Sequence, residues 1–166
     1  MKDRALLFAE AQIHHVALRV ADANASKAWF LTTLDFRVNR EFSFGGMDFI
    51  WLCPAESNVP VVEVIGGGLQ ASPPQYKNVL ESLEQPSFHH ICLQVNDLEQ
   101  IMSDLRGRDV KILIDVVDGA PGSGVGKGAF IADPWGNIFE LLELESSLFA
   151  TTQARLCSAC KPPHHL

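Results

Sequence analysis

Two histidine pairs and two isolated glutamates are the residues of this sequence best suited to chemistry. The segment around His15 reads IHHVALRVAD, the segment around His90 reads FHHICLQVND, and one offset relates them residue by residue. Glu63 follows His15 at nearly the separation at which Glu140 follows His90. Imidazole nitrogens and carboxylate oxygens form a mixed shell suited to Zn, Ni, Co, Mn or Fe(II). The repeat therefore predicts one divalent metal held by His15, Glu63, His90 and Glu140.

Both glutamates lie inside apolar segments, VPVVEVIGG for Glu63 and NIFELLELE for Glu140. A carboxylate is costly to bury alone and needs a partner such as a cation. A single histidine or glutamate on a strand is more often structural than a ligand, so the recurrence in both halves is what favours a metal. Alternation along each strand turns the other histidine of each pair toward the apolar face. We therefore interpret His14 and His89 as structural groups or as partners of the ligands.

The predicted metal would bind and activate a substrate that carries adjacent oxygen atoms. Two histidines and two glutamates leave two positions of an octahedral metal open, and the metal can act there as a Lewis acid that stabilises an enediolate. A glutamate that leaves the metal can take a proton from the carbon beside the carbonyl. Glu140 and Glu63 are both candidates for this catalytic base.

Four further residues are weaker candidates for substrate binding: Arg19, Gln94, Lys127 and Trp51. Arg19 and Gln94 share the face of the predicted ligands, and Lys127 lies in the glycine-rich segment 119–128, which predicts a mobile loop. Trp51 alternates with Met47 and Phe49, a spacing that suits either an apolar wall of the site or a core strand. Equally, Arg19 can pair with a neighbouring acid and Lys127 can be solvated.

The elements that must position these residues recur in the same order in both halves. Alternating strands fall within residues 13–22 and 88–97, and each precedes a helix. Asp22 or Asn24 caps the first helix, while Asp97 and Gln100 form a capping box for the second, which ends near Gly107. Three strands follow in each half, predicted at residues 36–44, 47–53 and 59–65 and at residues 109–116, 126–132 and 137–143. Each half is β-α-β-β-β, and a connection at 67–86 carries a short helix near Tyr76–Leu83.

The composition excludes several classes of partner. The 166 residues, 47% hydrophobic and 20% charged, suit one globular domain. A net charge of −7 argues against nucleic-acid binding, which needs a basic face. No apolar run approaches the length that spans a bilayer, and the N-terminus MKDRALLFAEAQ does not resemble a signal peptide. We expect a cytoplasmic protein that binds neither nucleic acid nor membrane.

The cysteines do not form a disulfide scaffold. Cys53 and Cys92 lie in apolar strands and are predicted to be small buried hydrophobes. Cys157 and Cys160 form a C-x-x-C near two histidines of the tail. A second zinc site there is less favoured than a frayed or partner-docked terminus, because the spacing is short and no second C-x-x-C is present.

The segments HVALRVAD, HICLQVNDL and AFIADPWGNIFEL resemble motifs of the vicinal oxygen chelate superfamily. This group includes glyoxalase I, methylmalonyl-CoA epimerase, type I extradiol dioxygenases, and fosfomycin and bleomycin resistance proteins. The resemblance covers residues 12–146 and is closest to glyoxalase I-like members. It implies an α+β fold in which two βαβββ modules form a curled, cup-shaped mixed sheet with helices outside. It also implies that the four predicted ligands match the family's metal-ligand positions.

Individual members of the family can be compared with this chain. Glyoxalase I has a carboxylate at the position of Glu63, and Lys127 resembles a lysine that contacts the glutathione carboxylate there. However, Thr32 and Gly67 replace an arginine and an asparagine of glyoxalase I, which disfavours glutathione. Phe130 replaces the tyrosine expected of extradiol enzymes. Fosfomycin enzymes use only two histidines and one glutamate, and bleomycin-binding members generally lack the ligands.

We therefore expect one glyoxalase-like domain over residues 1–146, with half-modules at 12–66 and 87–146 and a tail at 147–166. The expected function is that of a metal-dependent isomerase or lyase acting on a small oxygenated substrate. The alternatives are a small-molecule or antibiotic-binding resistance protein and a fosfomycin-type metal-dependent transferase. Four retained ligands favour the first function, since a pure binder does not need them. We expect a homodimer, with the two modules closing one cup within a chain or pairing between chains.

Overall fold

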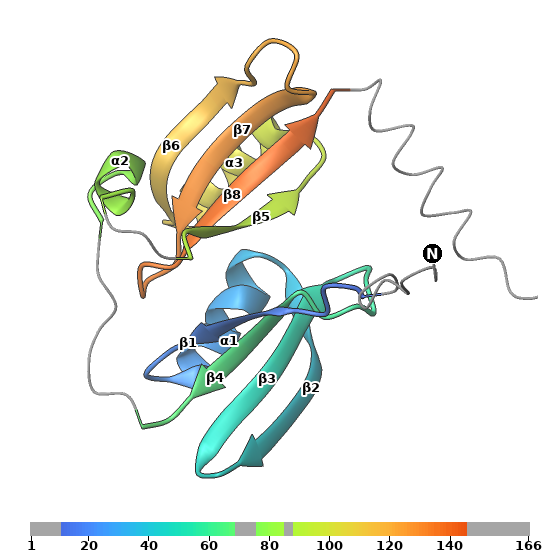
Figure 1. Ribbon diagram of the computed structural model, residues 1–166, viewed down its shortest axis with the longest axis vertical. Helices are drawn as coiled ribbons and strands as arrows, with labels where there is room; N and C mark the ends of the chain where they lie inside the picture. Colours follow the sequence, from blue (N-terminus) through green and yellow to red (C-terminus); the bar gives the residue numbers. More distant parts are fainter. Residues whose placement is uncertain (1–10, 69–75, 85–87, 146–166) are drawn as a thin grey trace, which may run out of the picture. The chain divides into compact units, whose positions relative to one another are not determined.

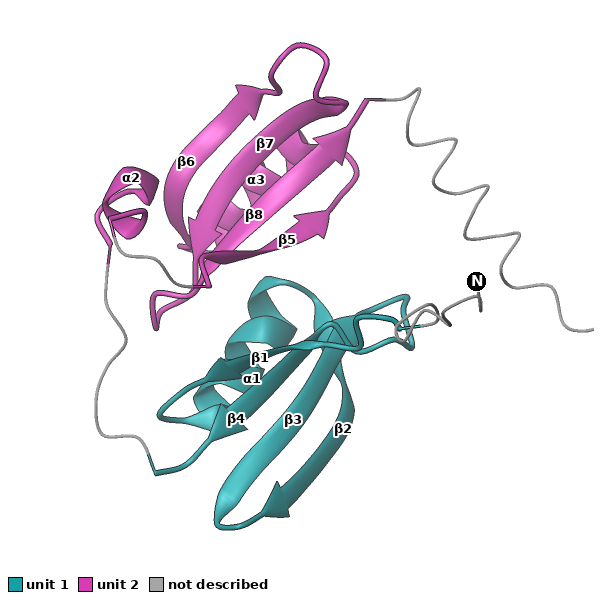
Figure 2. Ribbon diagram, in the orientation of Figure 1, with its two compact units in different colours: residues 1–72 teal, residues 73–166 magenta. Residues whose placement is uncertain are grey.

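The computed structural model of the protein describes residues 11–68, 76–84 and 88–145. The chain divides into two compact units, residues 1–72 and residues 73–166 (Figure 2). Each unit contains one of the two predicted halves, and each is described below by itself. The expectation of a single domain over residues 1–146 stays a prediction.

Unit 1 is a four-stranded mixed sheet with one helix on it (Figure 1). Its elements are β1 (Val16–Arg19), α1 (Ala23–Thr33), β2 (Phe36–Phe44), β3 (Met47–Pro54) and β4 (Val62–Gly66). The strand order is β1-β4-β3-β2, with β1 parallel to β4 and the other neighbours antiparallel. The predicted β-α-β-β-β order is confirmed for this half.

Unit 2 repeats the arrangement after one additional short helix. Its elements are α2 (Val79–Ser82), β5 (His90–Gln94), α3 (Leu98–Gly107), β6 (Lys111–Asp118), β7 (Val125–Ala132) and β8 (Ile138–Leu144). The strand order is β5-β8-β7-β6, with β5 parallel to β8. The two matched modules confirm the α+β, glyoxalase-like fold class. Among the described residues, no helix is long and apolar enough to cross a membrane.

The helices begin where the sequence predicts. The Asp22 side chain accepts from the Ala25 amide at 2.9 Å, so Asp22 rather than Asn24 caps α1. The Asp97 carboxylate accepts from the Gln100 amide at 3.2 Å. The predicted capping box is only half formed. The Gln100 side chain donates to the Asp104 carboxylate at 2.9 Å rather than returning a hydrogen bond to Asp97.

Each helix packs on the apolar face of its own sheet. In unit 1, Val62 and Val64 on one face of β4 are fully buried, as is Phe30 of α1. In unit 2, Leu98 and Met102 of α3 are likewise fully buried. Because successive strand residues point to opposite faces, the residues between these core positions, Glu63 among them, lie on the face away from the helix.

Three strand boundaries differ from the prediction by two or three residues: the start of β4 and both ends of β6. Strand β4 begins at Val62 rather than at residue 59, and Pro60 just before it has no amide proton for a ladder. Strand β6 begins at Lys111 rather than at residue 109, because the chain is still ending α3 there. Asp109 has a left-handed φ of 56° and donates its amide to Arg106 O at 3.2 Å.

Candidate functional site

The parallel pairing of β1 and β4 brings His15 and Glu63 together in unit 1. Ala17 lies directly opposite Glu63, and His15, two residues earlier, has the same side-chain direction as Ala17. His15 Nε2 lies 3.3 Å from Glu63 Oε2. Glu63 is only 9% exposed, so its carboxylate is one of the few buried charged groups of the described chain.

The pairing of β5 and β8 repeats this arrangement in unit 2. Cys92 lies directly opposite Glu140, as Ala17 lies opposite Glu63. His90 Nε2 lies 3.2 Å from Glu140 Oε2. The same two atom types therefore face each other at nearly the same distance in both halves.

These two His–Glu pairs fit a divalent metal. Ligand atoms about 2.1 Å from a metal and at right angles to each other are about 3 Å apart, so each pair has the spacing of two adjacent ligands. In the part of the chain that the structure describes, no three His, Cys, Asp or Glu side chains gather into a metal-binding group. Each unit thus presents two donors, and the predicted four-ligand site stays a prediction.

Trp51 contacts the glutamate of unit 1. Its indole N–H donates to Glu63 Oε1 at 2.7 Å, while Oε2 of the same carboxylate faces His15. The ring of Trp51 also lies 5.8 Å from the ring of His15. In unit 2 the residue paired with Glu140 is Phe130, whose ring meets His90 edge-on at 5.4 Å.

The first histidine of each pair contacts the second. His14 Nδ1 lies 2.7 Å from His15 Nδ1, and His89 Nδ1 lies 2.7 Å from His90 Nδ1. These contacts match the interpretation of His14 and His89 as partners of the candidate ligands. His89 Nε2 also lies 2.7 Å from Ser82 Oγ of α2. The sequence pattern does not predict the contact between Ser82 and His89, because nothing in it shows that α2 packs beside His89.

Aromatic side chains cover the same face of unit 1 beside Glu63. Phe42 stacks on Phe49 with ring centroids 5.1 Å apart and planes 4° apart. Phe42 also meets Trp51 edge-on at 5.8 Å, and Arg40 lies over the Trp51 ring at 5.5 Å. Ile50, between Phe49 and Trp51, is fully buried on the other face. Phe49 and Trp51 therefore lie on the face opposite the buried Ile50, and their role as an apolar wall of the site stays a prediction.

The other candidates for substrate binding have local partners or are exposed. The Arg19 guanidinium donates to Gly67 O at 3.2 Å and to Met47 Sδ at 3.4 Å, rather than to an acid. Gln94 is exposed on β5. The substrate roles of Arg19, Gln94 and Trp51 stay predictions.

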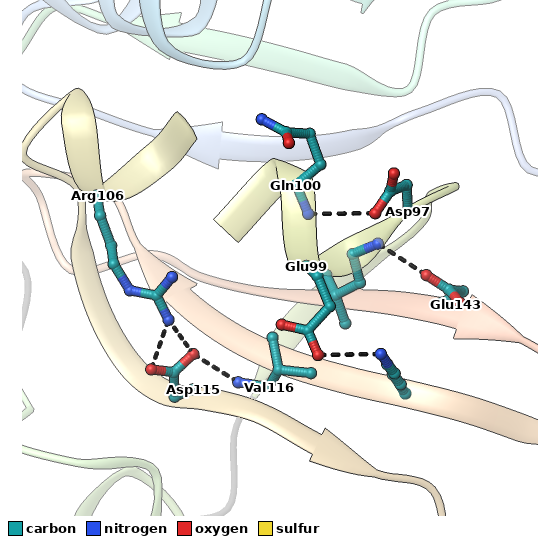
Figure 3. A network of polar contacts seen from close by, with 9 residues as sticks. Asp97, Glu99, Gln100, Arg106, Asp115, Val116 and Glu143 are labelled. Atoms are coloured by element: carbon teal, nitrogen blue, oxygen red, sulfur yellow. Dashed lines mark hydrogen bonds and ion pairs between the residues drawn. The ribbon is translucent and has the colours of Figure 1, made fainter. Parts of the chain in front are cut away.

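Lys127 pairs with the helix of unit 2. Its ammonium lies 2.9 Å from Glu99 Oε1, and this hydrogen bond is the main cause that raises the pKa of Lys127. Figure 3 shows Glu99 near the start of α3, where Asp97 caps the helix and Glu143 accepts from the Leu98 amide. Lys127 thus turns toward the helix-covered face, whereas Phe130 and Glu140 lie on the other face. This placement argues against the substrate role that the sequence suggested for Lys127, and the variant Lys127→Ala tests that role.

The two described cysteines differ. Cys53 is fully buried, as predicted, whereas Cys92 is exposed, so the prediction of a buried Cys92 is wrong. Cys92 lies on the less covered face of β5, beside Glu140. Although the residue is exposed, its thiol is partly covered, and this desolvation, the hydrogen bond to Glu140 and the charge of that carboxylate raise the pKa of the Cys92 thiol to about 12. Cys157 and Cys160 lie outside the described residues.

Asp133 forms a turn before β8. Its carboxylate accepts from the Trp135 amide at 2.9 Å, the Asn137 amide at 2.8 Å and the Asn137 side chain at 2.6 Å. The residue is 1% exposed, and burial raises the pKa of its carboxyl. The DPWGN segment therefore fixes the entry into the strand that carries Glu140.

Several solved structures share the fold of this chain. The crystal structure of SMU.1112c is 27% identical, with a TM-score of 0.62, and the match covers 80% of this chain and 98% of that one. The trypanothione-dependent glyoxalase I of Leishmania major is 23% identical, with a TM-score of 0.58 and coverage of 89% and 96%. TnmS3, an antibiotic binding protein from Streptomyces sp. CB03234, is 17% identical, with a TM-score of 0.57 and coverage of 82% and 98%.

No curated protein sequence matches the chain. A family model does match, over residues 12–141, which include both His–Glu pairs. The resemblance seen in the sequence motifs is thereby confirmed. The chain belongs to the Glyoxalase/Bleomycin resistance protein/Dioxygenase superfamily.

Proposed function

We propose that this protein is a metal-dependent lyase or isomerase that acts on a small substrate with adjacent oxygens through an enediolate-type intermediate. The observation that carries the proposal is the repetition of one His–Glu pair, with Nε2···Oε2 distances of 3.3 and 3.2 Å, in both halves of the chain. A binding protein without chemistry does not need two such pairs. Family membership supports the proposal, because enzymes such as glyoxalase I share this fold.

In this proposal His15, Glu63, His90 and Glu140 hold one divalent ion, which is Zn, Ni, Co, Mn or Fe. A bound ion supplies Lewis-acid chemistry that makes the carbon next to a substrate carbonyl more acidic. The four donors meet either within one chain or between two copies in a homodimer. The small-molecule partner and a cytoplasmic location belong to the same proposal.

The surroundings of the two carboxylates favour Glu140 as the base that takes the proton. Glu63 has one oxygen held by the Trp51 indole and the other beside His15. Glu140 is paired on one side with Phe130, which has no donor, and on the other with Cys92, whose thiol is only a weak donor. A base must be able to turn toward the substrate carbon. Glu63 therefore suits the role of a fixed ligand.

A second function is favoured by the aromatic face of unit 1. Phe42 is 39% exposed, stacks on Phe49 and adjoins Trp51. Such a surface suits a planar apolar ligand, and one structural relative is an antibiotic binding protein. In this alternative the protein sequesters a small molecule and performs no reaction.

One experiment separates the two functions. The full chain is loaded with each candidate metal, its metal content is measured, and exchange of substrate carbon-bound hydrogen in heavy water is followed by NMR on α-hydroxy ketones and thiohemiacetals. We expect metal-dependent exchange in the native protein and a loss of several orders of magnitude in Glu140→Gln. Tight metal binding without exchange on any substrate would favour the binding function. Failure of the protein to bind any of these metals would contradict both the proposed metal site and the proposed enzymatic function.

A further inference from the structure

Three polar contacts connect α2 to Glu140 within unit 2. Ser82 Oγ lies 2.7 Å from His89 Nε2, and His89 Nδ1 lies 2.7 Å from His90 Nδ1. His90 Nε2 then lies 3.2 Å from Glu140 Oε2. Ser82 is 3% exposed, so water does not compete freely for its hydroxyl group. The four side chains form one continuous chain of donors and acceptors.

Which atom donates in each of these hydrogen bonds follows from the acceptor of the Ser82 hydroxyl proton. Ser82 Oγ lies 2.6 Å from the carbonyl oxygen of Val79, which can only accept a hydrogen bond. The single hydroxyl proton therefore points to Val79, and Ser82 must accept from the Nε2–H of His89. A neutral His89 then has a bare Nδ1, which accepts from the Nδ1–H of His90.

His90 is consequently left with a bare Nε2 that faces the carboxylate of Glu140. Two atoms that present lone pairs to each other at 3.2 Å repel, so a cation between them stabilises this arrangement, and in the metal-free chain the Glu140 carboxylate can relieve the repulsion by turning away. A neutral imidazole with an unprotonated nitrogen is also the form that binds a metal. The tautomer that Ser82 imposes is therefore the one that a metal ligand needs.

We infer that Ser82 is a positioning residue that acts through His89 to hold His90 in the Nδ1–H tautomer, ready to bind a metal together with Glu140. The inference deepens the proposed function and rests on it for the identity of the ligands. It assigns a role to the connection between the two halves, which carries Ser82. That segment is anchored to unit 2 a second time, because Lys111 donates to the carbonyl oxygen of Tyr76 at 2.7 Å.

The first test is the tautomer of each histidine in the metal-free full chain, read from the ¹⁵N chemical shifts of the ring nitrogens at neutral pH. We expect Nε2–H for His89 and Nδ1–H for His90 in the native protein. In Ser82→Ala we expect both rings to become mixtures of tautomers. A native His90 that carries its proton on Nε2 would overturn the inference, and this result needs no variant to fold.

The second test is metal affinity, measured by titration with Co²⁺ or Ni²⁺ against a competing chelator. Loss of a residue that orients a ligating histidine weakens binding by roughly 10–100-fold, and we expect about tenfold for Ser82→Ala. The matched control is Ser26→Ala, which also removes a buried hydroxyl but one without a hydrogen-bond partner among the described residues. We expect the control to bind like the native protein.

The outcomes separate the inference from the function on which it rests. An unchanged affinity in Ser82→Ala, with the native protein binding metal, would overturn the inference and leave the function standing. A native protein that binds neither metal would count against the proposed function, while the ring tautomers would still decide whether Ser82 sets the proton of His90.

Discussion

Trp51 and Glu63 lie directly opposite each other on β3 and β4, and the indole N–H of Trp51 donates to Glu63 Oε1 at 2.7 Å. Phe130 and Glu140 occupy the matching positions on β7 and β8, but a phenyl ring has no proton to donate. Each half therefore has a glutamate at the matching strand position, but the side chain opposite that glutamate differs. Unit 1 orients its glutamate with a strong indole donor, whereas in unit 2 the only further side-chain donor beside Glu140 among the described contacts is the weak Cys92 thiol, which restrains the carboxylate less.

The first prediction concerns Trp51→Phe, which removes the indole donor and keeps an aromatic ring. A buried carboxylate that loses a hydrogen bond is costly, so we expect the free energy of unfolding to fall by about 1–3 kcal/mol in urea titrations. Metal affinity should fall as well, because Glu63 loses its fixed orientation. The control, Trp135→Phe, removes an indole outside this contact. Equal effects of the two variants would show that the Trp51–Glu63 bond has no special role.

The sequence predicts this architecture well where the pattern repeats. Alternation predicts β2 to the residue. The recurrence of one His and one Glu per half singles out residues that the structure places in pairs, His15 beside Glu63 and His90 beside Glu140, whereas their convergence on one metal stays a prediction. Both relationships follow from the side-chain direction of adjacent strands, which is a local property.

The details that the sequence does not predict depend on tertiary contacts. Cys92 has apolar neighbours, but its strand position turns it to the less covered face. The Lys127 ammonium finds Glu99 on a helix that packs beneath β7, and no spacing in the sequence reveals this pair. Ser82 reaches His89 only because a short helix packs against the start of β5. Each case is decided by which elements become neighbours.

The second prediction tests whether both His–Glu pairs hold one ion. If they do, His15→Ala and His90→Ala should each abolish tight binding of the same metal equivalent. The double variant should then lose little more than either single variant, because residues that act as a unit are not additive. Metal content by mass spectrometry, with circular dichroism to confirm folding, measures this. Two independent sites would instead show half of the metal remaining in each single variant.

The third prediction concerns Lys127, whose ammonium pairs with Glu99 at the surface. Exposed ion pairs contribute little to stability because solvent screens them, so Lys127→Ala should barely change the free energy of unfolding. Because Lys127 turns toward α3, metal affinity and substrate exchange should also stay within about twofold of the native values. Glu99→Gln is the matched variant on the other side of the pair. A large rise in KM for Lys127→Ala alone would restore Lys127 as a substrate-binding residue.

The fourth prediction is a pH dependence of stability that arises at Asp133. Burial raises the pKa of its carboxyl in the folded state above the ordinary value of 3.8, and its hydrogen bonds offset only part of that effect. The folded protein therefore binds this proton more tightly than the unfolded chain, so the stabilising contribution is complete below pH 3.8 and is lost as the pH rises through the folded-state value.

The measurement compares Asp133→Asn with the native protein, so that the titration of other carboxylates cancels. The variant lacks the acceptor for the Asn137 side chain, and we expect it to be less stable by about 1–3 kcal/mol. Since only the native protein loses the Asp133 contribution on ionisation, this difference should be largest at low pH and should shrink as the pH rises. A difference that grows with pH would mean that the turn stabilises the ionised carboxylate, with the hydrogen bonds outweighing burial.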